Sequence, residues 1–75
     1  MDTKDVRIGQ LVTWGTGSIR GEVTMPVFNE RNPETGANEP FALCALTRAY
    51  TTPCGIDIPK GTPVSVPVNE LRVLS

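Results

Sequence analysis

Apolar and polar residues alternate most cleanly in the segment Ile19-Arg20-Gly21-Glu22-Val23-Thr24-Met25-Pro26-Val27. Its odd-numbered positions carry the apolar residues and a glycine, and its even-numbered positions carry Arg, Glu, Thr and Pro. A period of two predicts an antiparallel β-strand with one solvated face. Pro26 has no amide hydrogen to donate to a neighbouring strand, so we expect that end of the strand to form an edge or a bulge.

The same period is found on the amino-terminal side of this segment. Val6, Ile8, Val12 and Trp14 share one parity, which predicts an earlier strand before the turn-like Gly15-Thr16-Gly17-Ser18. The glycines of this turn invite a phosphate-loop interpretation, but the Gly-Lys-Ser/Thr sequence and the helix that such a loop requires do not follow. We therefore predict a β-turn between two strands.

A long polar stretch follows on the carboxyl-terminal side, from Asn29 to Pro40. Within it, Asn32-Pro33-Glu34-Thr35-Gly36 suits a type I turn, because Pro stands at the second position and Gly can adopt a positive φ. We predict a long hairpin with its tip near residues 34–36. Phe28 falls on the parity opposite that of the preceding strand, so its ring is expected to be exposed beside this hairpin.

The run Phe41-Ala42-Leu43-Cys44-Ala45-Leu46 is apolar on both parities. It predicts a central strand that is covered on both faces, although a short helix would also explain the run. Glycine and proline nearby and the strand-rich context favour the strand. Beyond it, Thr51-Thr52-Pro53-Cys54-Gly55 predicts a turn, and Ile56 and Ile58 alternate with Asp57.

The last part of the chain predicts two more strands. Val64, Val66 and Val68 alternate with Pro63, Ser65 and Pro67, and Val68-Asn69-Glu70-Leu71 suits a single 3₁₀ turn before a final strand over Arg72-Val73-Leu74. The fold class predicted for the whole chain is all-β: a small barrel of five to six short antiparallel strands with one long hairpin loop. We expect a flexible tail over residues 1–5 and a single domain over residues 6–75.

Composition restricts the chemistry. The chain has 75 residues, with seven Lys and Arg against eight Asp and Glu, and no histidine. Histidine-based triads, histidine-ligated metals and imidazole switches are therefore excluded. The acidic residues are scattered, without the close spacing of a catalytic pair or a calcium loop. We predict that the protein is not an enzyme and has no catalytic residue, no cofactor and no metal site.

The two cysteines, the termini and the net charge bear on location and partners. Cys44 lies in the most apolar run and is expected to be buried and unbridged, whereas Cys54 belongs to a Pro-Gly turn and is expected to be exposed. The amino terminus lacks the apolar stretch of a secretory signal, so we predict a cytoplasmic protein with no membrane partner. A net charge of -1 does not favour nucleic acid, although that partner stays open.

Three short motifs resemble those of small SH3-like barrels: Gly9-Gln10-Leu11-Val12-Thr13-Trp14, Gly21-Glu22-Val23 and Val66-Pro67-Val68-Asn69-Glu70-Leu71-Arg72-Val73. Such barrels often open with a glycine turn into a strand and often close with a 3₁₀ turn before a last strand. The tail is also similar to that of plasmid-encoded, trimethoprim-insensitive dihydrofolate reductases, in which several subunits surround one pore. Their tail has a Val-Gln-Ile-Tyr-Pro-Val run, whereas here Pro67-Val68 is preceded by Val64-Ser65-Val66, without the Gln and Tyr that hold cofactor and substrate in that family.

We therefore predict a non-catalytic interaction module that binds protein, either a larger partner or itself, in the manner of an accessory protein of a phage or other mobile element. Alternatives are an SH3-like barrel that binds nucleic acid and an oligomeric pore enzyme related to those reductases. Arg7, Arg20 and Arg48 would form a modest basic face if their strands are neighbours, and Trp14 is either a binding residue or part of a core or interface. The candidate partner-binding residues are Trp14, Phe28, Arg20, Arg48 and Tyr50.

The apolar run at residues 41–46 also predicts self-association. One barrel has a single interior, so a strand that is apolar on both faces needs a second cover. The hairpin at Asn29 to Pro40 is almost wholly polar, which makes a second subunit the better candidate for that cover. We expect a homo-oligomer, most simply a dimer, with Phe28 or the outer face of residues 41–46 at the contact.

Overall fold

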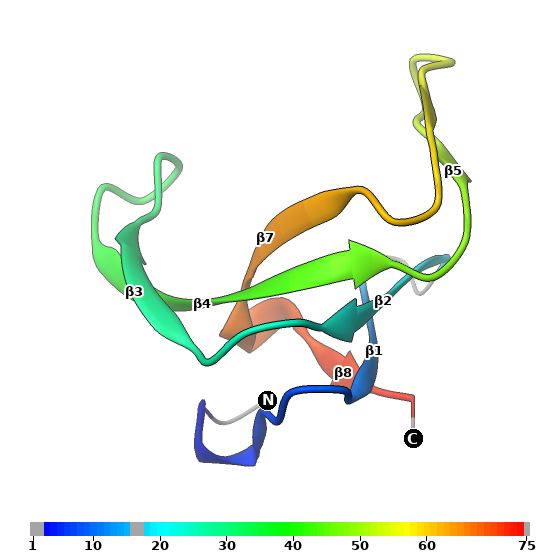
Figure 1. The fold of residues 1–75 in the computed structure, drawn as a ribbon. Coiled ribbons are helices and arrows are strands. Elements are labelled where there is room, and N and C mark those ends of the chain that lie inside the picture. Colours follow the sequence, from blue (N-terminus) through cyan, green and yellow to red (C-terminus); the bar gives the residue numbers. More distant parts are fainter. Residues whose placement is uncertain (1–2, 16–17, 75) are drawn as a thin grey trace.

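The computed structural model describes residues 3–15 and 18–74, and over these residues the protein is all-β (Figure 1). The strands are β1 (Leu11–Trp14), β2 (Ile19–Val23), β3 (Phe28–Arg31), β4 (Asn38–Leu46), β5 (Tyr50–Thr51), β6 (Asp57–Ile58), β7 (Pro63–Pro67) and β8 (Arg72–Val73). Two 3₁₀ turns, η1 (Thr3–Asp5) and η2 (Val68–Glu70), complete the elements. The structure confirms the all-β class and rules out the helical alternative for residues 41–46. Thr16 and Gly17, in the predicted β1–β2 turn, and Met1 and Asp2, in the predicted tail, lie outside the described residues.

The nine residues of β4 organise the main sheet. On one edge of β4, β3 pairs with residues 38–41 and β2 pairs with residues 44–46; β7 also pairs with β4, over residues 41–45. The sheet then continues through β1 to β8, and every pair of strands in it is antiparallel. β2 and β3 follow one another in sequence and are joined by a bend at residues 24–27. The segment from β2 to β3 therefore runs along most of the length of β4. Pro26 lies in this bend, outside both strands.

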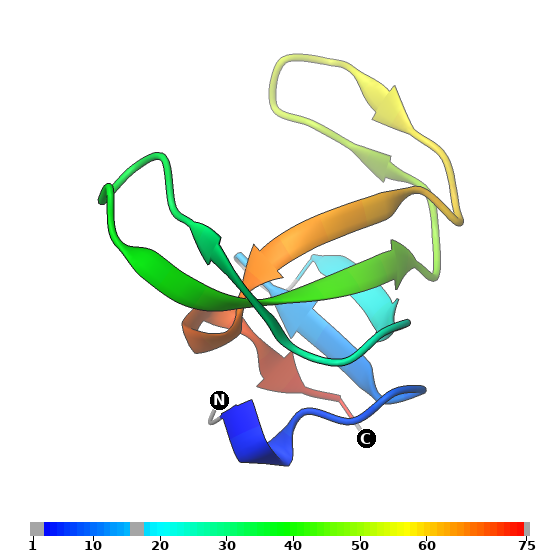
Figure 2. The same ribbon diagram turned by 60° about the vertical axis from the view of Figure 1, so that its left-hand side comes forward.

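The hydrophobic core lies between the β4–β7 pair and the β1–β8 pair (Figure 2). Alternate residues of β1, β2, β4 and β7 point into it, and η2 and the residue after it close one end. Its members are Val12, Trp14, Val23, Ala42, Cys44, Leu46, Val66, Val68 and Leu71. The alternation of apolar residues in the sequence thus predicts most of the residues of the core.

Some residues that parity assigned to strands lie outside them, among them Ile8 and Met25. Ile8 is 63% exposed, because the chain turns at residues 8–9 and β1 begins only at Leu11. This turn is held by the amide of Gly9, which donates to the carbonyl of Val23 at 2.8 Å. Met25 is 40% exposed, because β2 ends at Val23 and the chain bends away. Alternation continues in the sequence where the hydrogen-bonded ladder has already stopped.

Gly21 lies against the ring of Trp14. A Cβ atom at position 21 would approach Cη2 of Trp14 to 2.9 Å and the carbonyl oxygen of Ala45 to 3.1 Å. The first distance is shorter than carbon atoms tolerate, and the ring is held in the core, so only glycine fits without displacing its neighbours. The indole of Trp14 therefore fills the space that a side chain on β2 would otherwise take.

The predicted long hairpin is confirmed, and its first strand covers one residue of the outer face of β4. Arg31 of β3 lies opposite Asn38 of β4, and the ring of Phe28 stacks on the ring of Phe41 with centroids 6.3 Å apart. Phe41 is only 6% exposed, although it is outside the core cluster. The stack covers the Phe41 end of the outer face of β4, while Leu43 and Ala45 on that face are half-buried, so the predicted homo-oligomer stays a prediction.

The two cysteines are placed as predicted. Cys44 is buried in the core and Cys54 is exposed, and both are free thiols. Burial raises the pKa of the Cys44 thiol to about 11, because the thiolate would lose its hydration in the apolar interior. Cys44 is therefore a packing residue that stays neutral at ordinary pH.

Candidate functional site

A hollow of about 170 Å³ lies between the turn of the β3–β4 hairpin and the 3₁₀ turn η2. We call it the hairpin hollow, and it is lined by Asn32, Pro33, Glu34, Phe41, Pro67 and Glu70. Phe41 and Asn32 are its buried members and form the floor, while Pro33, Glu34 and Glu70 are exposed and form the rim. The hollow therefore combines an aromatic floor, two prolines and two carboxylates.

Strand register brings the apolar part of the hollow together. Phe41 lies directly opposite Phe28 on β3 and opposite Pro67 on β7. Residues that are direct partners across antiparallel strands point to the same face, so these three side chains form one row. Phe28 stacks on Phe41 from the side of β3, which fixes the ring at the floor of the hollow.

The 3₁₀ turn η2 positions Glu70 on the opposite rim. Val68 and Leu71 are fully buried on either side of it, and the amide of Leu71 donates to the carbonyl of Val68 at 3.1 Å. These two anchors leave the residues between them on the surface, where Glu70 is exposed. Pro67, which precedes the turn and ends β7, brings its ring to the same wall.

Asn32 makes the hairpin turn rigid. Its side-chain oxygen accepts from the amide of Glu34 at 2.9 Å, and its side-chain nitrogen donates to Oε2 of Glu39 at 2.8 Å. Its backbone amide donates to the carbonyl of Ala37 at 2.9 Å, and its carbonyl accepts from the amide of Gly36 at 2.7 Å. Gly36 has a φ of +74°, a conformation that L side chains rarely adopt. The backbone of Glu34 is thus held in place at the rim.

The charges around the hollow are of one sign. The charged residues that line it are Glu34 and Glu70, and no lysine or arginine is among the lining residues. A third carboxylate nearby, that of Glu39, is occupied by Asn32 and by the hydroxyl of Thr35 at 3.4 Å. The lining side chains are one aromatic ring, two proline rings, one amide and two carboxylates. Among residues 3–15 and 18–74, no group of three or more potential metal ligands comes together.

The aromatic candidates from the sequence are distributed over the molecule. Trp14 is 8% exposed and belongs to the core. Tyr50 is half-buried and packs against the core from β5. Phe28 is half-buried rather than fully exposed, and it supports the floor of the hollow through Phe41.

Two of the predicted basic residues, Arg20 and Arg48, lie on segments that meet at the β1–β2 turn, and Arg72 joins them there in place of Arg7. Thr13 on β1 lies opposite both Arg20 on β2 and Arg72 on β8. Arg72 donates through Nη2 to the carbonyl of Gly15 at 2.9 Å. Arg48 donates through Nη2 to the carbonyl of Ser18 at 3.1 Å. We call Arg20, Arg48 and Arg72 the arginine cluster.

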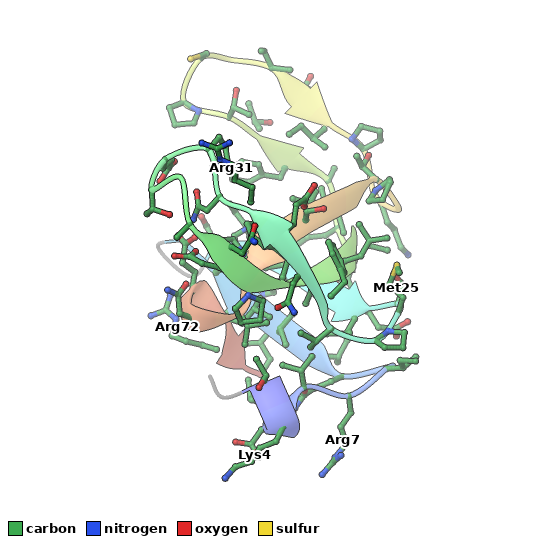
Figure 3. The ribbon with its side chains drawn as sticks, turned by 90° about the vertical axis from the view of Figure 1, so that its left-hand side faces the viewer. Lys4, Arg7, Met25, Arg31 and Arg72 are labelled. Carbon is green, nitrogen blue, oxygen red and sulfur yellow. The ribbon has the colours of Figure 1, made fainter. Side chains whose placement is uncertain are left out.

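Arg7, the remaining member of the predicted basic face, is placed elsewhere. Figure 3 shows Arg7 and Lys4 at the lower end of the molecule and Arg72 at its left side. The turn at residues 8–9 separates Arg7 from β1, so the parity that would have placed it beside Arg20 does not apply.

The sequence alone did not identify the residues of the hairpin hollow as a site. It predicted the turn at residues 32–36 and the 3₁₀ turn at residues 68–71, but as separate features. The missing information is the register that sets Phe41 opposite Pro67 and so brings the two turns together. No local pattern carries that register.

Comparison with known proteins gives no match: no family model, no curated protein and no solved structure matches this chain. Within residues 3–15 and 18–74, no helix has the length and apolar character needed to cross a membrane.

Proposed function

We propose that this protein is a non-catalytic interaction module that binds a segment of another protein at the hairpin hollow. The observation that carries the proposal is the hollow itself: an aromatic floor and two prolines beside exposed carboxylates, on a turn already held by four hydrogen bonds of Asn32. Small hollows with an apolar floor and a few fixed polar groups are typical binding sites. A rigid turn also reduces the entropy lost when a partner binds.

We further propose that the chain is an SH3-like barrel that acts in the cytoplasm. The strand order β8-β1-β2-β4-β7, with η2 between β7 and β8, supports the first part. Two free cysteines suit a reducing compartment and support the second part. Self-association stays part of the proposal, since Leu43 and Ala45 on the outer face of β4 are only half-buried.

Selection from a library of random peptides displayed on phage tests the proposed function. The selected peptides are then titrated into ¹⁵N-labelled protein, and the shifted amide signals are mapped on the structure. We expect binders whose signals map to Asn32, Glu34, Phe41, Val68 and Glu70. A selection without binders, or binders that map only to other faces, would contradict the proposal. Light scattering of the same sample over a concentration series measures self-association.

A second candidate function is binding of nucleic acid, which the arginine cluster favours. Three guanidinium groups lie near the β1–β2 turn, and arginine is well suited to phosphate recognition. Binding of labelled single-stranded RNA at increasing salt tests this function. Each phosphate contact contributes a slope of about 0.7 in the logarithmic salt dependence. Arg20→Ala should reduce the slope, Arg7→Ala should leave it unchanged, and a flat titration of the unmodified protein would end this candidate.

A further inference from the structure

We infer that the hairpin hollow receives a lysine or arginine side chain from the partner segment. This inference rests on the proposed function and adds to it the chemistry of the ligand. A long basic side chain has an apolar stem and a cationic end, and the hollow offers surfaces for both.

The floor of the hollow fits the apolar stem. Phe41 is held from one side by the Phe28 ring, and Pro67 lies directly opposite it on β7. Neither the ring nor the prolines offer a side-chain donor or acceptor, so these surfaces suit methylene groups. Lysine and arginine commonly bury their methylene groups along such a surface while the charged end stays in water.

The rim fits the cationic end. Glu34 and Glu70 stand on two different turns and are exposed, so a cation between them would meet carboxylates from both sides without losing all its hydration. Among residues 3–15 and 18–74, no lysine or arginine lines the hollow. The members of the arginine cluster with assigned hydrogen bonds, Arg48 and Arg72, donate to backbone carbonyls at the β1–β2 turn. Charge-assisted bonds to a carboxylate are shorter and stronger than neutral ones.

The hairpin turn gives this arrangement its selectivity. The amide of Glu34 is fixed by Asn32, and Glu39, the other carboxylate of the turn, is engaged by Asn32 and Thr35. The turn therefore presents Glu34 to the hollow and keeps Glu39 occupied. A neutral or acidic side chain entering the hollow would gain no charge-assisted hydrogen bond to either rim carboxylate, so the hollow discriminates by charge.

The test uses two peptides that differ in one charge. The first is acetyl-Ala-Ala-Arg-Ala-Ala-amide, and the second replaces arginine with citrulline, which has nearly the same shape and is neutral. Both are titrated into the ¹⁵N-labelled full chain at low salt, together with a lysine peptide. We expect the arginine and lysine peptides to shift the amides of Glu34, Phe41 and Glu70. The citrulline peptide should bind at least about tenfold more weakly, as the loss of one charged hydrogen bond implies.

Variants of the protein that remove one rim carboxylate at a time complete the test. Glu34→Gln and Glu70→Gln should each weaken binding of the arginine peptide by about three- to tenfold. Glu30→Gln, on the same hairpin but outside the hollow, should not change the affinity. All three substitutions are at exposed positions, and the amide spectrum of each variant reports whether it is folded.

Equal binding of the arginine and citrulline peptides would overturn the inference, as would full binding by the double variant Glu34→Gln/Glu70→Gln. The failure of the inference is distinct from that of the proposed function. If displayed peptides without lysine or arginine are selected and map to the hollow, the proposed function stands and the charge requirement falls. If neither the selection nor the titration yields binding at the hollow, both fall.

Discussion

The β3–β4 hairpin and the β5–β6 hairpin are attached to the protein in different ways. Both turn at a proline followed within a few residues by a glycine. The first is continuous with the main sheet through β4, whereas the second forms a separate sheet of two short strands that projects from the body in Figure 1. The first hairpin carries the aromatic stack of Phe28 on Phe41, whereas the second contacts the core through Tyr50 and Ile58, which lie opposite each other.

The two turns also differ in how their polar groups are satisfied. Asn32 is a buried polar residue. Its side chain bonds to the backbone of Glu34 in the β3–β4 turn and to the carboxylate of Glu39 at the start of β4. In the β5–β6 turn, the hydroxyl of Thr52 accepts from the amide of Ile56 at 3.0 Å, and that of Thr51 donates to Asp57 at 2.8 Å, both on the surface. Hydrogen bonds open to water add less stability and open more readily than buried ones. We therefore expect the β3–β4 turn to open less readily than the β5–β6 turn.

The largest expected effect is that of Phe41→Ala. Removal of a buried ring, together with its stack on Phe28, should lower the free energy of unfolding by about 3 kcal/mol. Unfolding in urea, followed by the fluorescence of Trp14, measures the change. Ile56→Ala in the other hairpin is the control, since that side chain is 62% exposed and should cost less than about 0.5 kcal/mol. Equal midpoints for the two variants would remove the distinction between the hairpins.

The rates at which the two cysteines are alkylated provide a second comparison of the two hairpins. Cys54 in the β5–β6 turn should react with iodoacetamide at pH 8 about a hundredfold faster than Cys44 in β4, because Cys44 is buried and its pKa is raised to about 11. Since only the thiolate reacts, the ratio should narrow as the pH rises toward that value. Mass spectrometry of peptides from the partly labelled protein gives both rates. Similar rates at pH 8 would mean that β4 is not the interior strand.

A smaller effect is expected from Asn32→Ala. The variant loses two side-chain hydrogen bonds and leaves the amide of Glu34 and a carboxylate oxygen of Glu39 without these partners, which should cost about 2 kcal/mol. The urea midpoint measures the cost, and binding of the arginine peptide should weaken as Glu34 becomes mobile. Unchanged stability together with unchanged binding would show that the turn does not depend on Asn32.

The smallest effect is that of Thr51→Val. It removes the surface hydrogen bond to Asp57 but conserves the shape of the side chain and the strand propensity of the position, so global stability should change by less than about 0.5 kcal/mol. Hydrogen exchange of the amides of residues 51–58 should accelerate while exchange at Cys44 stays the same. A fall in the urea midpoint comparable to that of Asn32→Ala would show that the β5–β6 hairpin supports the whole fold.

Local pattern predicted the parts of the fold that depend on neighbouring residues. The alternation around Gly21 and Val23, the turn at Asn32 and the 3₁₀ turn after Pro67 were all predicted correctly. The alternation wrongly placed Ile8 in the first strand. A hydrogen bond from the amide of Gly9 to the carbonyl of Val23 holds a turn there, before the strand pairing begins. Alternation describes which side chains could share a face, but hydrogen bonding to a distant strand decides where the face ends.

The candidate site was much less predictable. The hairpin hollow depends on the register between β4 and β7, which is a contact between residues far apart in the chain. The requirement for glycine at position 21 likewise depends on the indole of Trp14 lying across β2. Arg72 was absent from the predicted basic face because its neighbour Thr13 is in the first strand and Arg72 is in the last. Each of these features is set by strand pairing rather than by local sequence.

The pairing of β1 with β8 has a mechanical consequence. Leu11 begins β1, and the amide of Leu74, just after β8, donates to the carbonyl of Leu11 at 2.9 Å. The chain therefore enters one strand and leaves the other at the same end of an antiparallel ladder. Tension applied through the two chain ends loads the hydrogen bonds one after another, as in opening a zipper, rather than all together. The protein should therefore yield at a low force, and β8 should peel away first and expose Val12 and Leu71 before the rest of the sheet opens.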